Sequence, residues 1–102
     1  MSPAELNDLI ARKRAADRAR RKEQTRIQDR IRAAFGPGER ELSYHILARR
    51  VFPAADYPKA WRYSSNGGPP GCYMALSTAI RRMDLHTRYT EGSERFVARP
   101  RQ

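Results

Sequence analysis

Cysteine and histidine are nearly absent from this sequence, whose 102 residues include one cysteine and two histidines. Cys72 has no partner for an intramolecular disulfide, and Cys72, His45 and His86 are too few for a four-ligand zinc site. We therefore expect no structural metal and no cofactor. A reducing compartment suits a chain with this cysteine content.

Long apolar runs are also missing. No stretch approaches the roughly 20 apolar residues that a membrane-spanning helix needs. The N-terminus lacks the order of a charged region followed by an apolar region that marks a secretory signal. These absences predict a cytoplasmic protein without a membrane partner.

Clustered carboxylates, which acid–base and metal-dependent catalysis require, are absent as well. The 11 acidic residues are scattered among arginines, and no pair has a spacing suited to general acid–base chemistry. His45 and His86 are isolated in the sequence, and Cys72 has no base beside it. We expect no catalytic residue and a protein that is not an enzyme.

Positive charge is what the sequence has in excess. Lysine and arginine number 21, which gives a formal net charge of +10 and a pI near 10.8. Such a chain attracts polyanions: DNA, RNA, an anionic membrane surface or an acidic protein. Nucleic acids are favoured because each neutralised phosphate releases a counterion.

The first third of the chain predicts one long helix from Pro3 to Phe35. Ser2–Glu5 forms a capping box with proline at the first helical position, and Gly36–Gly38 stops the helix. Apolar residues gather at its two ends, where we expect buried faces. They are Leu6, Leu9 and Ile10 at the start, and Ile27, Ile31, Ala34 and Phe35 at the end.

The middle of this helix is strongly basic. Ion pairs of Asp8 with Arg12 and of Asp17 with Arg21 would occupy two of its cations, and we expect the others to contact phosphates. Pairing with a second copy in a homodimer is a further hypothesis, although no heptad pattern predicts a long coiled coil. The cations are Arg12, Lys13, Arg14, Arg18, Arg20, Arg21 and Lys22.

The remainder, residues 36–102, predicts a small α+β domain. Its expected elements are an extended segment at Arg40–Leu42, a helix at Tyr44–Phe52 capped by Ser43, a helical turn at Lys59–Arg62, a loop at Ser64–Gly71, a helix at Cys72–Met83, and a β-hairpin with arms at His86–Thr90 and Arg95–Arg99. The predicted fold is therefore mainly α with a small β-hairpin: a long basic helix over residues 1–35, then this domain.

The order of these elements resembles the winged helix-turn-helix family over roughly residues 27–100, with a longer connection at Pro53–Gly71 than is usual there. The resemblance implies that Cys72–Met83 enters the major groove of DNA and that the hairpin contacts the backbone or minor groove. Trp61–Gly71 also resembles segments of small phage and prophage proteins.

The resemblance points to polar and basic residues of the last helix and the hairpin as nucleic-acid contacts, since guanidinium groups match phosphate and guanine edges. Cations at a helix C-terminus also stabilise its dipole, so a structural role stays open for Arg81 and Arg82. Strand alternation predicts Arg95 and Arg99 on one face with Val97. The candidates are Ser77, Thr78, Arg81, Arg82, Arg88, Arg95 and Arg99.

Three functional hypotheses follow. The first is sequence-specific or architectural binding of double-stranded DNA, as in a phage transcriptional regulator associated with the nucleoid. The second is a phage-encoded module that docks on a host polymerase or nuclease complex through a cluster of aromatic residues. The same cluster could instead stack on bases, and Trp61 could instead fill the core. These residues are Tyr57, Trp61, Arg62 and Tyr63. RNA binding is the third.

Overall fold

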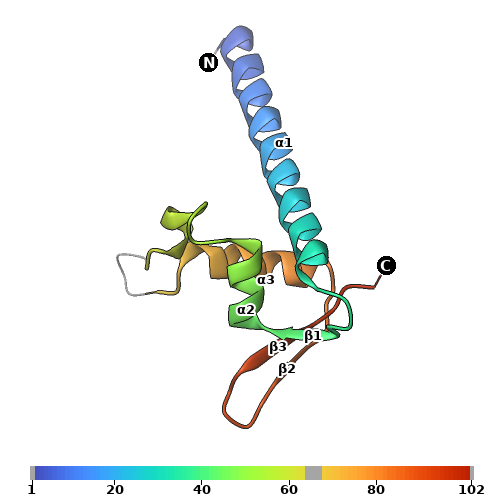
Figure 1. Ribbon diagram of the computed structural model, residues 1–102. Helices are drawn as coiled ribbons and strands as arrows, with labels where there is room; N and C mark the ends of the chain where they lie inside the picture. The colour runs from blue at the N-terminus through green and yellow to red at the C-terminus, as the bar shows by residue number, and fades with distance from the viewer. Residues whose placement is uncertain (1, 64–67, 102) are drawn as a thin grey trace.

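The computed structural model describes residues 2–63 and 68–101, and it confirms the α+β class and the long N-terminal helix (Figure 1). Residues 64–67 of the predicted loop lie outside the described residues. The elements in order are α1 (Pro3–Ala34), β1 (Glu41–Ser43), α2 (Tyr44–Val51), the 3-10 turn η1 (Pro58–Trp61), α3 (Gly71–Arg82), β2 (Thr87–Tyr89) and β3 (Arg95–Ala98).

Local signals fix both ends of α1. The Ser2 hydroxyl accepts a hydrogen bond from the Glu5 amide at 3.2 Å, and the Glu5 carboxylate accepts one from the Ser2 amide at 3.3 Å. This is the predicted capping box. At the other end Phe35 is extended, and Gly38 has a φ of +80°, which favours glycine.

Most of α1 projects from the domain (Figure 1). The radius of gyration is 17.2 Å, compared with about 13 Å for a compact chain of this length. The prediction of a buried face at the start of the helix is wrong, because Leu6, Leu9 and Ile10 are 41–50% exposed on the part of α1 that projects from the other described elements. Within the described residues, we find no helix with both the length and the apolar character for crossing a membrane.

The last two turns of α1 are part of the hydrophobic core. Ile27 and Ile31 point between α2 and α3, as the spacing at this end of the helix predicts. The other helices and the sheet contribute the remaining core side chains, so one core joins all layers. Its largest members include Ile31, Phe35, Leu47, Val51, Phe52, Leu76, Ile80 and Val97.

A three-stranded antiparallel sheet with the order β1-β3-β2 closes the domain. Val97 lies opposite Leu42 on one side and opposite Thr87 on the other. Val97 is fully buried, so the face of β3 that carries Val97, Arg95 and Arg99 is directed toward the helices, as alternation predicts. The pairing of β1 with β3 adds a strand to the predicted hairpin.

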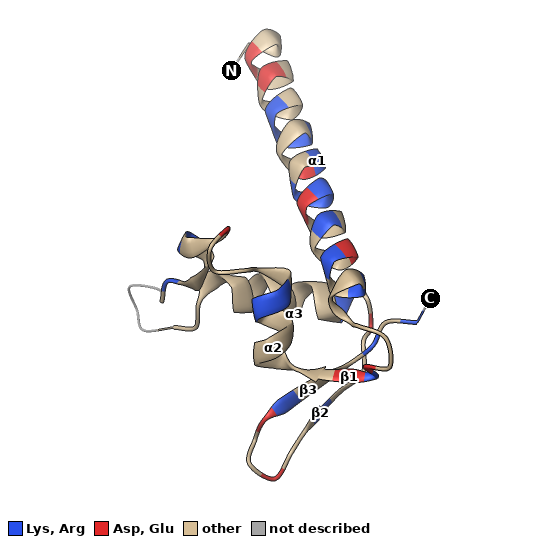
Figure 2. Cartoon of the chain, viewed as in Figure 1, with Lys and Arg blue, Asp and Glu red and all other residues tan. Residues whose placement is uncertain are grey.

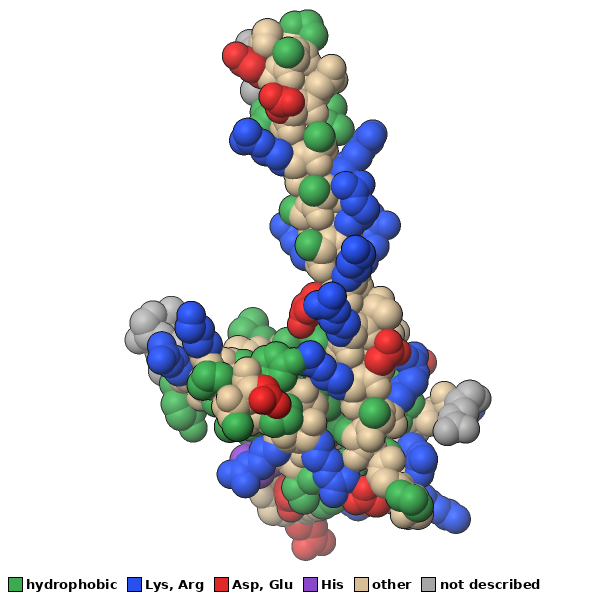
Figure 3. All heavy atoms as spheres, turned by 45° about the horizontal axis from the view of Figure 1, so that its top comes forward, with side chains coloured by type: hydrophobic (Ala, Val, Ile, Leu, Met, Phe, Trp, Pro, Cys, Tyr) green, Lys and Arg blue, Asp and Glu red, His purple; other side chains and the backbone are tan. Residues whose placement is uncertain are grey.

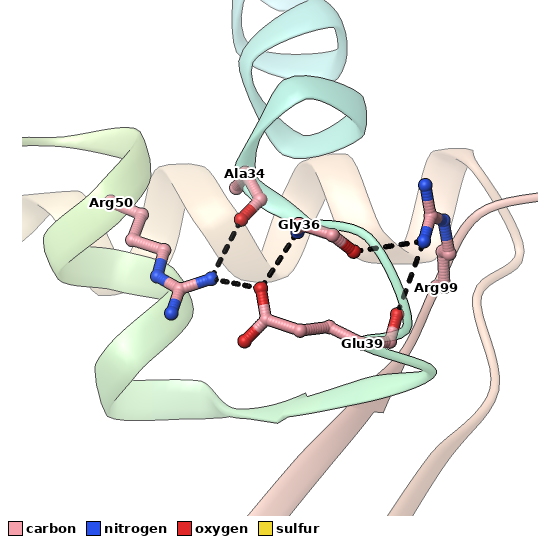
Figure 4. A network of polar contacts seen from close by, with 5 residues as sticks. All are labelled: Ala34, Gly36, Glu39, Arg50 and Arg99. Carbon is pink, nitrogen blue, oxygen red and sulfur yellow. Dashed lines mark hydrogen bonds and ion pairs between the residues drawn. The ribbon is translucent and has the colours of Figure 1, made fainter.

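A polar network fastens the end of α1 to the rest of the domain (Figure 4). The Glu39 carboxylate accepts hydrogen bonds from the Gly36 amide at 2.7 Å and from Arg50 at 2.6 Å. Arg50 also donates to the Ala34 carbonyl at 2.9 Å, which is one of the unpaired carbonyls at the helix end. The turn after α1 is therefore bound to α2.

Replacing Ile31 by alanine should destabilise the whole domain, because it opens a cavity where three helices meet. We expect I31A to lower the free energy of unfolding by about 3 kcal/mol in a urea titration. Ile10→Ala, the same substitution on the projecting part of α1, is the matched control and should cost less than about 0.5 kcal/mol. Equal losses in both variants would contradict this description of the core.

The network around Glu39 should make stability depend on pH in the acid range. The hydrogen bond from Arg50 lowers the pKa of the Glu39 carboxyl. The stability that the ionised Glu39 adds to the fold is therefore fully present above the ordinary carboxyl pKa, and it is lost as the pH falls through the lowered pKa. Thermal unfolding followed from pH 7 to about pH 3 should therefore show a smaller acid loss for E39Q than for the wild type. Glu91→Gln, at the exposed hairpin turn, should leave the profile of the wild type unchanged.

Candidate nucleic-acid interface

One face of α3 and the adjoining strand β3 form the first candidate site. Two adjoining grooves of about 330 and 360 Å³ run between them, and both are lined by Ser77, Arg81 and Arg95. Met74 and Thr78 extend the same face toward the start of α3. We call these five residues the α3–β3 groove. Four of them, all except Met74, are predicted contact residues that the fold brings together.

Tyr44 organises the floor of this groove. Its hydroxyl donates to the Tyr73 carbonyl at 2.6 Å and lies 2.5 Å from the Ser77 hydroxyl. The Arg95 guanidinium lies over the Tyr44 ring at 4.8 Å from its centroid. Burial raises the pKa of the Tyr44 phenol, which therefore stays neutral. The contact of Tyr44 with β3 depends on long-range packing that local sequence patterns do not reveal.

Hydrogen bonding decides which side chains of the groove are free to contact a ligand. The Ser77 hydroxyl is engaged by Tyr44, and the Thr78 hydroxyl donates to the Met74 carbonyl at 3.0 Å. Met74 is 67% exposed. Arg81 is also exposed, and no hydrogen bond or ion pair within residues 2–63 and 68–101 involves its guanidinium. Met74 and Arg81 are thus the side chains most available to a partner.

Two predicted hairpin contacts are directed elsewhere. Arg88 lies on the opposite face of the sheet, where it makes two hydrogen bonds to Glu41 and stacks over Phe96 at 4.7 Å. Its hydrogen bonds lower the pKa of the Glu41 carboxyl. Arg99 donates to the Gly36 carbonyl at 3.0 Å and to the Glu39 carbonyl at 3.4 Å (Figure 4). The structure does not bring these two arginines to the α3–β3 groove.

The predicted cations of α1 are all exposed, and they cover several sides of the projecting helix (Figures 2 and 3). Asp17 pairs with Arg20 at 3.5 Å rather than with Arg21, so that predicted pair is wrong by one residue: the i,i+3 partner lies within reach. The pair of Asp8 with Arg12 is not among the ion pairs of the described residues. The cations left without an ion pair there are Arg12, Lys13, Arg14, Arg18, Arg21 and Lys22.

The predicted aromatic cluster is used largely for packing. The Trp61 indole donates to the Phe52 carbonyl at 2.6 Å, and its ring meets the rings of His45 and Tyr73 edge to face. Tyr57 packs on Phe52 in the same way, with Arg30 over its ring. Of the four residues, Arg62 and Tyr63 are exposed, so the fold does not assemble the cluster into one open surface.

Cys72 and His45 are both engaged within the fold. Cys72 is 1% exposed, and burial raises the pKa of its thiol, which disfavours the reactive thiolate. His45 is paired with the Tyr73 hydroxyl at 2.9 Å. Among residues 2–63 and 68–101, no group of three or more histidine, cysteine, aspartate or glutamate side chains could hold a metal ion.

Comparisons with known proteins give no further guide. No protein-family model matches the chain, and no significant similarity to a curated protein or a solved structure was found. Any functional conclusion therefore depends on the geometry and charge described above.

Proposed function

We propose that this protein binds double-stranded DNA in the manner of winged-helix proteins, with α3 in the major groove and the β2–β3 hairpin beside it. The element order supports this proposal, and so does the position of Arg95 of β3, whose side chain lines the same grooves as Ser77 and Arg81 of α3. The mechanism is binding without chemistry, which suits a transcriptional regulator or an architectural protein. The resemblance of residues 61–71 to phage segments favours a phage regulator.

The α3–β3 groove is the observation that carries the proposal. With 12 residues, α3 is about 18 Å long, and the major groove, about 12 Å wide, admits a helix. The Arg81 guanidinium can form paired hydrogen bonds with a guanine edge or a phosphate, and the exposed Met74 side chain can contact thymine methyl groups. Arg95, placed by Tyr44, adds charge at the border between helix and hairpin.

The projecting part of α1 supports the same partner. An isolated helix of this composition is marginal in water, but this one continues from turns that are buried in the core. It presents six cations without ion pairs in the described structure, and a surface of this kind is suited to the phosphate backbone. The helix thus extends the positive surface beyond the domain.

Arg81 and Arg88 form a matched pair for testing the groove, because both are exposed arginines but only Arg88 is committed to an internal carboxylate. In a fluorescence-anisotropy titration with mixed-sequence duplex DNA, we expect R81Q to weaken binding about tenfold and R88Q less than about threefold. Equal losses would show that binding follows net charge alone. Absence of duplex binding at low salt would refute the proposed function and favour a protein partner. Substitutions of the exposed Tyr63 and Arg62 should then weaken the binding of that partner.

Removing residues 1–22 should test the contribution of α1 without disturbing the core, whose first buried residue is Ile27. The slope of log K against log salt concentration should become less steep by about 0.9 for each phosphate contact that is lost. The thermal unfolding midpoint of the shortened protein is the control and should stay within a few degrees of the full chain. An unchanged salt slope would exclude phosphate contact by the projecting helix.

A further inference from the structure

A second basic surface lies apart from the α3–β3 groove, at the base of α1. A hollow of about 650 Å³ opens there between the last turns of α1, the end of α3 and the C-terminal segment. We call it the basic hollow. The ionisable side chains that line it are Arg32, Arg82, Asp84, His86, Arg99 and Arg101.

The charges of the basic hollow are poorly balanced within the protein. Arg32 is paired with Asp29 at 3.0 Å, and Arg99 is bound to carbonyl groups of the turn after α1. No hydrogen bond or ion pair of the described residues involves the guanidinium of Arg82 or of Arg101. Convergence of like charges on one hollow costs free energy, and an anion would relieve that cost.

The end of α3 separates this hollow from the α3–β3 groove. Asp84 has a φ of +53°, which lets the Leu85 amide turn back to the Ile80 carbonyl at 3.1 Å and ends the helix. Arg81 lines the groove and Arg82 lines the hollow, about 100° apart around the helix. Asp84 borders both, so an acidic side chain stands between two basic surfaces.

A row of arginines continues the basic hollow along α1. At about 100° per residue, Arg14, Arg18, Arg21 and Arg32 lie within about 60° of one another around the helix axis. The row from Arg14 to Arg32 is about 27 Å long and is interrupted between Arg21 and Arg32, where Thr25 and Gln28 occupy the same side of the helix. One DNA strand carries about eight phosphates over that length. Such a row can follow a nucleic-acid backbone into the hollow.

We propose that the basic hollow is a phosphate-binding site, with Arg82 and Arg101 as its principal ligands. Every permanently charged cation that lines it is an arginine, whose planar guanidinium forms paired hydrogen bonds with phosphate oxygens. The row on α1 favours backbone phosphates as the source, and in this respect the inference rests on the proposed function. A free nucleotide offers the same chemistry and is the other source.

The test uses the double variant R82Q/R101Q and the matched double variant R40Q/R49Q, which removes the same charge from exposed positions outside the hollow. Arg99 is left in place because it is bound to the turn after α1. The probes are labelled duplex DNA, inorganic pyrophosphate and ATP, and circular dichroism confirms that each variant is folded. Amide shifts of residues 82–86 and 99–101 in NMR spectra report where each probe binds.

If the hollow binds phosphate, R82Q/R101Q should weaken duplex binding at least tenfold, lower the salt slope by about 1.8 and abolish pyrophosphate shifts in the hollow. R40Q/R49Q should retain these shifts and bind duplex within about threefold of the wild type. Shifts with ATP and pyrophosphate but no duplex binding would keep the phosphate site, assign it to free nucleotides and refute the proposed function.

Two outcomes would contradict the proposal that the basic hollow binds phosphate. Duplex binding that is lost in R81Q but retained in R82Q/R101Q, with no pyrophosphate shifts in the hollow, would overturn this inference and leave the proposed function intact. Absence of shifts in the hollow with all three probes would also overturn it.

Discussion

The burial of Ile27 and Ile31 between α2 and α3 anchors the long helix α1 in the hydrophobic core of the domain. A helix rich in arginine has little intrinsic stability as an isolated segment, because nucleation is costly and its like charges repel. Here the last turns are fixed by the core, and the preceding turns propagate from an already formed helix. Apolar packing at one end thus supports a solvated cationic rod at the other.

The hydrogen bonds around Glu39 fix the orientation of α1 relative to α2. Arg50 binds both the carboxylate of Glu39 and the carbonyl of Ala34, so the end of α1 is joined to α2 by charge-assisted hydrogen bonds. Arg99 binds the same turn from the end of β3. The direction in which α1 leaves the domain is consequently set by contacts from α2 and the sheet, which also position α3.

The arginines divide into two groups according to their partners. Arg50, Arg88 and Arg99 are bound to acids or carbonyls within the fold, whereas the guanidiniums of Arg81, Arg82 and Arg101 have no such partner among the described residues. A net charge of +10 destabilises a compact state through self-repulsion. The exposed arginines without internal partners add to this repulsion, and no internal contact offsets it. The proposed functions therefore use these arginines to bind an anionic partner.

Local signals predicted the elements well and their long-range contacts poorly. The capping box at Ser2, the stop at Gly36–Gly38 and the Ser43 cap of α2 each depend on neighbouring residues, and all were confirmed. The pairing of β1 with β3, the contact of Arg95 with Tyr44 and the pairing of Arg88 with Glu41 join residues about 50 positions apart. Exposure of Leu6 was missed because an apolar stripe predicts a buried face only when another element is present to cover it.

Mapping the contact surface by NMR would show whether the α3–β3 groove contacts duplex DNA. In a titration of isotope-labelled protein with a short duplex, we expect the largest amide shifts over Gly71–Arg82 and Arg95–Ala98, with smaller shifts along α1. Shifts confined to α1, with α3 and the hairpin unchanged at saturation, would contradict this expectation.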